Sequence, residues 1–395
     1  DIRHIYVVGA GKASALMAQE VEAVLGSHIT AGHIIVKHGH ICPLIYCKVT
    51  EAGHPTPDSS GFRATQEILD MVKNADENDL VICLLSGGGS SLLADHPAGA
   101  SPEDMIKLNQ LLLGSGANIH EMNAVRKHLS GVKGGQLAGA VYPASLVSLI
   151  LSDVIGDSPD VIASGPTSPD SSTFQDAQTI LEKYQLVSKL PVSLKEHIQK
   201  GIIGVVPETP KKGENIFNNV YNLIIGSNSL ALQAAKEKSE ELGIRAEIIT
   251  SELDGDASEV AKMLVDRAVC RQEELKPGEK LCLLFGGETT VVVSGSGLGG
   301  RNQHLALCAA QLLEGKGGIT LLSAGTDGND GPTDAAGAVV TSYTKEEALK
   351  NNIDAKTYSE IFDSYHFFKK AGGHVITGST LTNVMDLIII LIEKE

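Results

Sequence analysis

The sequence predicts an α/β fold with two α/β domains, of which the N-terminal one is Rossmann-like with a mainly parallel sheet. Three observations support this fold class. The chain has 395 residues, more than one ordinary hydrophobic core organises. Short apolar runs alternate with helical patterns along the chain, and glycine and polar residues separate them. The apolar runs are continuous, which is typical of parallel strands that are buried on both faces.

The expected strands are each followed by polar residues, and most are then followed by a helix. Because ligands bind beyond the carboxyl ends of strands in such sheets, these polar clusters are expected to line one crevice. The expected strands lie at His4–Val8, Leu80–Leu85, Leu146–Leu151, Val220–Ile225, Leu281–Phe285, Ile319–Leu322 and Ile388–Ile392. The clearest helical patterns are Ala13–Leu25, Gly61–Lys73, Ser229–Leu242 and Ala257–Glu274.

A stretch rich in glycine, proline and charge, Lys200–Asn219, predicts the domain boundary. The N-terminal domain is therefore expected at 1–205 and the C-terminal domain at 215–395. Such a stretch should be exposed and should be the first site of limited proteolysis.

Composition excludes several classes of protein. No apolar run is long enough to span a membrane, and no signal peptide is visible. A net charge of −16 argues against a nucleic-acid binder. The six cysteines form no CxxC pair, which favours reduced thiols and a cytoplasmic protein. Residue 1 is Asp rather than Met, so we expect further residues before it in the natural chain.

Two glycine-rich segments follow predicted strands in the N-terminal half. In GAGKAS, Lys12 stands at a helix start, where the helix dipole disfavours a cation, and contact with an anionic ligand would explain it. A solvated surface lysine is the alternative. SGGGSSLL offers a concave run of backbone amides for an oxyanion, carboxylate or phosphate, formed by Ser86, Gly87, Gly88, Gly89 and Ser90.

The stretch from Leu281 to Gln303 is the centre of the C-terminal half. An apolar run ends at Glu288, a β-rich segment follows, and a loop with four glycines leads to a helix near Arg301. Amides at a helix start bind phosphate, so Gly297, Gly299 and Gly300 are candidates. If the loop is only a turn, Arg301 lies at the unfavourable end of the helix dipole, and Arg301→Ala should leave stability unchanged or slightly improved.

Further charged residues follow other strands. Asp153 and Asp157, and in the second half Asp327, Asp330 and Asp334, could supply oxygen ligands to Mg²⁺ or could be turn residues. In NAVRKHLSGVKGG, a continuous helix would place three residues on one face: Arg126, Ser130 and Lys133. Ligand binding and ordinary capping explain these cations equally well.

A dinucleotide-binding loop is the rival interpretation. Gly295–Gly300 satisfies GxGxxG, follows a strand-like segment and precedes a helix. The acid that should bind the ribose about 20 residues further on is not in place, so a nicotinamide-dependent dehydrogenase ranks second. A non-catalytic sensor of a phosphorylated metabolite is a third hypothesis.

The motifs together resemble one family over essentially the whole chain: GAGKAS, GHPTPD, LLSGGGSSLL, MNAVRKHLSGVKGGQLA, SDVIGDSPDVIASGPTSPD, GGETTV, GLGGRNQ and TDGNDGPTDAAGA. This is the class II glycerate 2-kinase family, with a MOFRL C-terminal domain, some members of which were labelled hydroxypyruvate reductases. The resemblance implies an active site in a cleft between two α/β domains. It also implies transfer of the ATP γ-phosphoryl group to D-glycerate, giving 2-phosphoglycerate and ADP.

The family's conserved polar residues fall on Lys12, Asp153, Glu288, Arg301, Asp327 and Asn383. The family's usual TGPTGTN reads TGSTLTN here, so Ser379 and Leu381 put the role of Asn383 in question.

We assign the catalytic roles by charge. Lys12 and Arg301 are expected to neutralise phosphate and carboxylate charge, and Mg²⁺ is expected on three carboxylates: Asp153, Glu288 and Asp327. One of these carboxylates could orient the attacking hydroxyl. The expected partners are glycerate and ATP, and a homodimer is compatible with the sequence. An NAD(P)H-dependent hydroxypyruvate reductase is the alternative function. Which glycine-rich loop holds nucleotide and which holds glycerate is left open.

Overall fold

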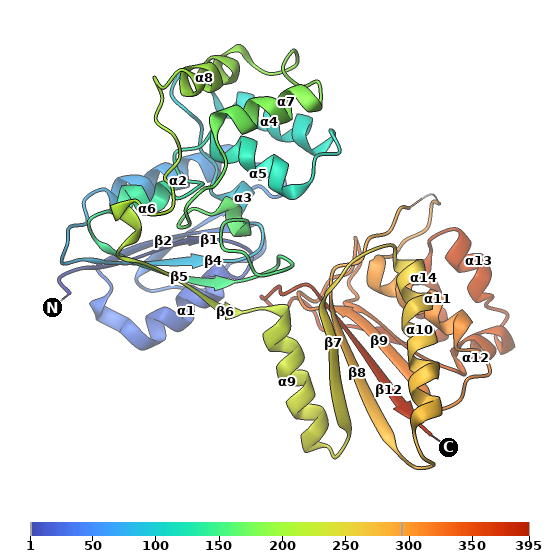
Figure 1. Ribbon diagram of the computed structural model, residues 1–395. Helices are drawn as coiled ribbons and strands as arrows, with labels where there is room; N and C mark the ends of the chain where they lie inside the picture. The colour runs from blue at the N-terminus through green and yellow to red at the C-terminus, as the bar shows by residue number, and fades with distance from the viewer. Residues whose placement is uncertain (1, 294, 395) are drawn as a thin grey trace. The chain divides into compact units, whose positions relative to one another are not determined.

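The chain divides into two compact units, Asp1–Ile225 and Gly226–Glu395 (Figure 1). This computed structural model describes residues 2–293 and 295–394. Each unit has α/β architecture around one six-stranded sheet of described residues, so the predicted fold class is confirmed. The division comes after Ile225, whereas the sequence predicted it between 205 and 215.

The sheet of the first unit has the strand order β3-β2-β1-β4-β5-β6. All strand pairs from β3 to β5 are parallel. The order reverses between β1 and β4, and in this Rossmann arrangement ligands bind at that reversal, beyond the carboxyl ends of the strands. The strands are β1 Ile5–Ala10, β2 Ala31–Lys37, β3 Cys47–Ala52, β4 Leu80–Leu85, β5 Ser145–Leu151 and β6 Val220–Gly226.

Helices cover both faces of this sheet. On one face α1 (Ser14–Leu25) packs against β2 and β4. On the other, α2 (Ser59–Val72) and α6 (Gln136–Val141) pack with a second set of strand residues. A further helical layer has its own apolar cluster of α4 (Pro102–Leu113), α5 (Ile119–Lys127), α7 (Phe174–Lys183) and α8 (Val192–Ile202). Short helical turns are α3 Gly89–Leu92, η1 Gly26–His28, η2 Ile162–Ser164 and η3 Asn215–Phe217.

The sheet of the second unit has the order β11-β10-β9-β12-β8-β7 and is mixed. Among the described residues of this sheet, β7 and β8 are the only neighbouring strands that pair in parallel. β12 lies antiparallel between β8 and β9. β8 and β9 therefore run in the same direction, and their carboxyl ends meet the start of β12 at one edge. The parallel pairing expected from the apolar runs holds for one pair here. The strands are β7 Arg245–Leu253, β8 Lys280–Gly287, β9 Ile319–Gly325, β10 Gly337–Thr341, β11 His374–Val375 and β12 Asp386–Glu393.

The main core of the second unit lies between this sheet and the helices on one of its faces (Figure 1). α10 (Ala257–Glu274) and α11 (Arg301–Leu312) supply most of it, with Phe285 and Ile390 from the strands. On the opposite face α9 (Asn228–Glu241) packs against β7 and β8. The remaining helices are α12 Thr344–Lys350, α13 Ala355–Glu360 and α14 Ser364–Ala371.

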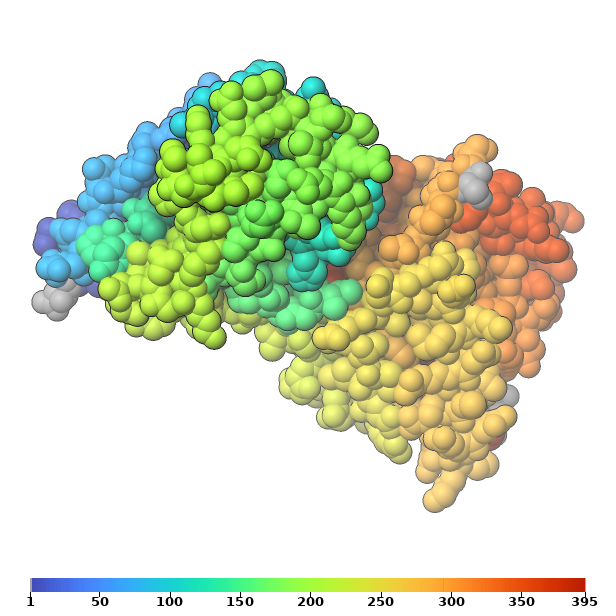
Figure 2. All heavy atoms as spheres, turned by 45° about the horizontal axis from the view of Figure 1, so that its top comes forward, coloured from blue at the N-terminus to red at the C-terminus, as the bar shows by residue number. Residues whose placement is uncertain are grey.

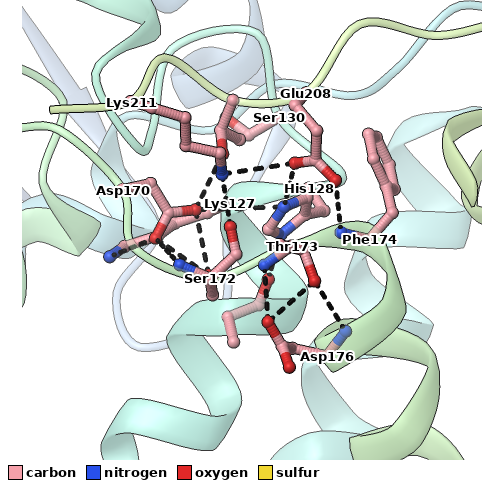
Figure 3. A network of polar contacts seen from close by, with 12 residues as sticks. Lys127, His128, Ser130, Asp170, Ser172, Thr173, Phe174, Asp176, Glu208 and Lys211 are labelled. Atoms are coloured by element: carbon pink, nitrogen blue, oxygen red, sulfur yellow. Dashed lines mark hydrogen bonds and ion pairs between the residues drawn. The ribbon is translucent and has the colours of Figure 1, made fainter. Parts of the chain in front are cut away.

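The segment after α8, residues 203–215, lies on the surface of the first unit, where its residues are mostly exposed (Figure 2, yellow-green). It is nevertheless anchored by polar contacts (Figure 3). Glu208 accepts a hydrogen bond from the Phe174 amide at the start of α7, at 2.8 Å. The same carboxylate lies 3.0 Å from Nε2 of the buried His128. The predicted linker is therefore part of the first unit, and first cleavage within it stays a prediction.

Asp170 is the centre of this network. Its side chain is 1% exposed, and Lys127 Nζ lies 3.2 Å from it. The Thr209 hydroxyl donates to the second carboxylate oxygen at 2.9 Å, and the Ser172 hydroxyl donates to both. Burial tends to raise the pKa of Asp170, but the charge of Lys127 and these hydrogen bonds lower it below its usual value. The network joins the end of α5, the approach to α7 and the segment after α8.

Lys127→Met is expected to destabilise the protein by about 3 kcal/mol, because it leaves the buried carboxylate of Asp170 without its cation. Urea unfolding followed by circular dichroism measures this. Lys183→Met is the control, since Lys183 forms an exposed ion pair with Glu121 and should change stability little. Equal stability of the two variants would contradict the structural role of Lys127.

Candidate active site

The loops after β1 and β4 touch at the strand-order reversal of the first sheet. The Lys12 amide donates to the Gly87 carbonyl at 2.8 Å, and the Ala13 amide donates to Ser86 Oγ at 3.0 Å. A Cβ on Gly11 would lie 2.0 Å from Ser86 Oγ, so this approach requires glycine. The structure thus brings together two of the predicted segments, GAGKAS and SGGGSS, with Lys12 at their junction.

His54, which follows β3, lies beside the second of these loops. Gly88 has φ +85°, and a Cβ there would lie 2.9 Å from the His54 ring. Burial, helped by the charges of Lys12 and Lys37, lowers the pKa of His54 to about 4. His54 is therefore neutral at pH 7 and can accept or donate one hydrogen bond at this edge. From the sequence, His54 in GHPTPD is most simply interpreted as a turn residue, so its position beside this loop was missed.

The loop after β5 packs against the loop after β4. Ser90 Oγ lies 2.7 Å from Ser164 Oγ, and Ser164 Oγ donates to Asn123 Oδ1 at 2.9 Å. Ala163 and Ser164 have positive φ values of 52° and 61°, which are unfavourable for non-glycine residues and are often found at functional sites. Asp153 lies in the same loop, two residues after β5, and is half-buried.

Arg126 and Lys133 line one small cavity together with Ser90. The prediction that a continuous helix aligns them is wrong, because α5 ends at Lys127 and Lys133 lies in the turn that follows. The turn returns Lys133 to the cavity: its Nζ donates to the Leu93 carbonyl at 2.5 Å and lies 3.6 Å from Asp95. Arg126 Nε donates to Asn109 Oδ1 at 3.1 Å.

In the second unit, Arg301 is held between two carboxylates at the edge where β8 ends and β12 begins. Its Nε donates to Asp386 Oδ2 at 2.6 Å and its Nη2 to Asp386 Oδ1 at 3.0 Å. Its Nη1 lies 2.7 Å from Glu288 Oε1. Asp386, the first residue of β12, is 3% exposed and pairs in register with Gly287 and Gly325.

The charge of Arg301 is firmly fixed by these contacts. Burial alone would lower its pKa, but the hydrogen bonds and charge of Asp386, with the charges of Glu288 and Asp330, raise the pKa above its usual value. Sequence analysis placed Glu288 and Arg301 on either side of the glycine-rich loop and missed Asp386. The available signal was an acidic residue at the start of the otherwise apolar run DLIIILIE.

The glycine-rich loop before α11 has a different explanation from the one expected. Asp330 accepts hydrogen bonds from the Asn302 and Gln303 amides at 3.0 and 2.8 Å. Two of the first amides of α11 therefore already donate to a carboxylate of the protein. The Gly297 amide donates to the Ile361 carbonyl at 3.0 Å.

A Cβ on any of the predicted glycines would come within 2.5 Å of a neighbouring atom: Gly297 near Asp363, Gly299 near Ser364 and Gly300 near Asp330. Close packing accounts for these glycines, and phosphate binding by them is not required to explain the loop. Burial raises the pKa of Asp330, although the amides that it accepts from act in the opposite direction.

The expected strand before this loop is wrong for the described residues. After β8, the segment 289–293 forms only an isolated bridge between Thr290 and Asp256, and Ser294 lies outside the described residues. A dinucleotide fingerprint requires a strand, a glycine loop and a helix in succession. The GxGxxG match at 295–300 therefore lacks its structural context.

Asp327 and Asn383 lie in two loops that are hydrogen-bonded to each other. The Thr380 amide donates to the Asp327 carbonyl at 3.2 Å, and the Val384 amide donates to Thr326 Oγ1 at 2.8 Å. Leu381 has φ +56°, a left-handed conformation that suits the glycine expected from the resemblance. The loop thus adopts this conformation with Leu381 in place of glycine. Asn383 Oδ1 accepts from the Met385 amide at 3.1 Å.

The predicted metal ligands are divided between the two units. Among residues 2–293 and 295–394, no group of three His, Cys, Asp or Glu could hold a metal ion. Oxygen ligands for Mg²⁺ are still present in Asp153 of the first unit and in Glu288 and Asp327 of the second. Mg²⁺ commonly uses one or two carboxylates together with substrate phosphates, so a carboxylate of either unit offers the type of ligand that such binding needs.

Comparison with known proteins gives two matching families. Residues 1–199 match a domain of unknown function, DUF4147, and residues 281–386 match the MOFRL family. The chain is 45% identical to the D-glycerate 2-kinase of Thermotoga maritima over 99% of this chain and 91% of that protein. The chain belongs to the MOFRL glycerate kinase family.

The fold of this family agrees with the one described above. The crystal structure of glycerate kinase from Thermotoga maritima superposes with a TM-score of 0.90, at 45% identity, over 99% of this chain and 92% of that one. A relative from Agrobacterium vitis, 41% identical over 98% of this chain and 86% of that protein, has only a provisional name, hydroxypyruvate reductase. No helix in the described part of this family member is long and apolar enough to cross a membrane.

Proposed function

We propose that the protein is an ATP-dependent glycerate kinase that transfers the γ-phosphoryl group to the 2-hydroxyl of D-glycerate, giving 2-phosphoglycerate and ADP. Full-length similarity to glycerate kinases supports this reaction. The observation that carries the mechanism is Arg301, held by both oxygens of Asp386 at a strand edge. A pre-oriented guanidinium neutralises charge on a transferring phosphoryl group without reorganising during the reaction.

Some N–H donors of Arg301 contact carboxylates of the protein, and the others are left for the substrate. A guanidinium has about five N–H donors, and Asp386 and Glu288 account for three contacts with its Nε, Nη2 and Nη1. One donor on each terminal nitrogen is then left for phosphate oxygens, in the two-pronged geometry that arginine favours. Asp386 fixes the plane in which these two donors point.

In the first unit, the proposed role of Lys12 rests on the contact between the loops after β1 and β4, and that of Asp153 rests on the family resemblance. Lys12 neutralises an anionic group of the substrates beside the amides of Gly87 and Gly88, since the Gly89 amide already donates to the Ser86 carbonyl. Asp153 accepts the proton of the 2-hydroxyl as that oxygen forms its bond to the γ-phosphorus. The bond from this phosphorus to the oxygen bridging to the β-phosphate breaks, and ADP leaves with that oxygen. In the second unit, Asn383 holds its own loop through the Met385 amide, and that loop is hydrogen-bonded to the loop that carries Asp327.

Mg²⁺ is proposed as the metal, with Glu288, Asp327 and Asp153 as its candidate protein ligands. When bound with the nucleotide, it would neutralise charge on the phosphate oxygens. A cleft between the two domains, a cytoplasmic location and a homodimer stay predictions from the sequence. Sedimentation can check whether the protein is a homodimer.

Two coupled assays test the proposed function. With D-glycerate and ATP, we expect ADP formation, and enolase alone should convert the product to phosphoenolpyruvate, because enolase acts directly on 2-phosphoglycerate. With hydroxypyruvate we expect no NADH or NADPH oxidation. Activity should disappear with EDTA and return with Mg²⁺. Nicotinamide oxidation without ADP formation would overturn the proposal, and full turnover in metal-free buffer would overturn its metal requirement.

A further inference from the structure

We propose that the cavity lined by Arg126, Lys133 and Ser90 binds the carboxylate of the acceptor acid and so selects an acid over a neutral polyol. This inference rests on the proposed function and assigns one part of it to the first unit alone. The cavity has a volume of about 20 Å³, and its other walls are Pro57, Phe62, Ala94, Asp95, Met105 and Asn109.

Arg126 is a cation without a counterion at this cavity. Its Nε donates to the amide oxygen of Asn109, and among the described residues no carboxylate forms an ion pair with it. Burial lowers its pKa, and no neighbouring acid reverses that effect. A partly buried guanidinium in this state is unfavourable unless an anion joins it. An unpaired arginine in a protein of net charge −16 therefore indicates an anionic ligand.

Lys133 forms a rigid wall of the same cavity. Its side chain is 7% exposed, and Nζ is held by the Leu93 carbonyl and by Asp95. Asp95 is itself fixed, because it accepts hydrogen bonds from the Ser130 hydroxyl at 2.5 Å and from the Gly131 amide. Burial lowers the pKa of Lys133, and the charge of Asp95 acts against this while that of Arg126 adds to it. Two cations and one carboxylate leave the cavity with one uncompensated positive charge.

The size of the cavity decides which anion it takes. A volume of about 20 Å³ holds one water-sized group, since roughly 10–15 Å³ is the minimum for a water molecule. A single carboxylate can enter with a small adjustment of the flexible arginine, but a nucleotide base or a phosphate chain cannot. Ser90 adds a hydroxyl, which Ser164 holds from the other side. The acceptor acid is thus assigned to the loop after β4, and the junction around Lys12 is left for phosphate groups.

The direct test is Arg126→Met, which keeps the length and apolar contacts of the side chain and removes its charge. We expect the KM for D-glycerate to rise roughly 10- to 100-fold, the effect of a lost charged hydrogen bond. The KM for ATP should change by less than about twofold, as expected when only the acid subsite is altered. The melting temperature should stay the same or rise, because the variant removes an unpaired cation and leaves no carboxylate without its partner. Arg63→Met, an exposed position on α2, is the matched control and should leave both KM values unchanged.

A second substrate separates carboxylate binding from general damage. Wild-type enzyme should phosphorylate glycerol far less well than glycerate, because glycerol leaves Arg126 unpaired. Arg126→Met should lower kcat/KM for glycerate and leave the slow reaction with glycerol unchanged. Equal losses with both substrates, an unchanged KM for glycerate, or a rise in the KM for ATP instead would each overturn the proposal.

Calorimetry with D-glycerate alone distinguishes this inference from the proposed function. If wild-type protein binds glycerate without turning it over and Arg126→Met does not bind it, the kinase function fails and the carboxylate site stands. If both proteins bind glycerate equally, the carboxylate site fails whatever the activity is. If wild-type protein neither binds nor phosphorylates glycerate, both proposals are wrong.

Discussion

Arg301→Ala is expected to lower kcat by about 10³-fold or more, because arginines that neutralise the transferring phosphoryl group contribute on that scale. The same change should also destabilise the protein by about 3 kcal/mol, since the 3%-exposed carboxylate of Asp386 would lose its bidentate partner. The two effects have separate measurements: steady-state kinetics with glycerate and ATP, and urea unfolding.

This expectation corrects the one drawn from the sequence. On the condition that the loop is only a turn, a positive charge at a helix start predicted unchanged or slightly improved stability for Arg301→Ala. The ion pairs with Asp386 and Glu288 outweigh the helix dipole, which contributes only about 0.3–1 kcal/mol.

Arg301→Lys separates the two roles of the residue. Lysine keeps the positive charge beside Asp386, so stability should partly return. It lacks the planar guanidinium that can donate to a carboxylate from Nε and Nη2 and to a phosphate from its two terminal nitrogens. Activity should therefore stay low. Arg267→Ala, at an exposed position of α10, is the control and should match wild type in both measurements. Near-normal turnover of Arg301→Ala would rule out the proposed role of Arg301.

Local sequence patterns predicted the strands whose apolar runs are uninterrupted. Leu80–Leu85 and Leu281–Phe285 were found in this way. β2 and β3 were not predicted, and β3, CKVTEA, is a half-polar edge strand with no such run. The position of β12 could not be predicted either, because pairing with both β8 and β9 is a property of distant segments. A continuous apolar run shows that a strand is buried on both faces and does not show its direction.

The same limit applies to the site. Gly11 and Gly88 lie where neighbouring groups, Ser86 and the His54 ring, come too close for a Cβ, and the sequence shows such positions only as glycines. The glycines at 297, 299 and 300 look the same in the sequence, yet close packing against residues 361–364 and 330 explains them. Glycine composition alone does not distinguish a phosphate-binding loop from a tightly packed one.

Asp386 and Asp330 have roles that single-sequence reasoning does not identify. Each is a buried carboxylate whose role is defined by a partner far away in the chain: Arg301 for Asp386, and the first turn of α11 for Asp330. Arg126 and Lys133 were selected for an incorrect reason, a continuous helix, and the turn after α5 still brings both to one cavity.

Asp386→Asn is expected to lower kcat by about 100-fold, because a misplacement of roughly 1 Å in a catalytic group costs that much. Asparagine has the shape of aspartate but only one acceptor oxygen, so it cannot accept from both Nε and Nη2 of Arg301. The guanidinium then loses its fixed plane. If Asp386 acts by positioning Arg301, the KM for glycerate should change little while kcat falls.

A double-mutant cycle with alanine tests this coupling. Asp386→Ala and Arg301→Ala each leave one charge of the pair uncompensated, and the double variant leaves neither, so it should be less destabilised than the sum of the two single changes. For kcat, adding Asp386→Ala to Arg301→Ala should cost little more, because a residue that acts through Arg301 has no effect once Arg301 is gone. Fully additive losses in both kcat and stability would show that Asp386 acts independently of Arg301.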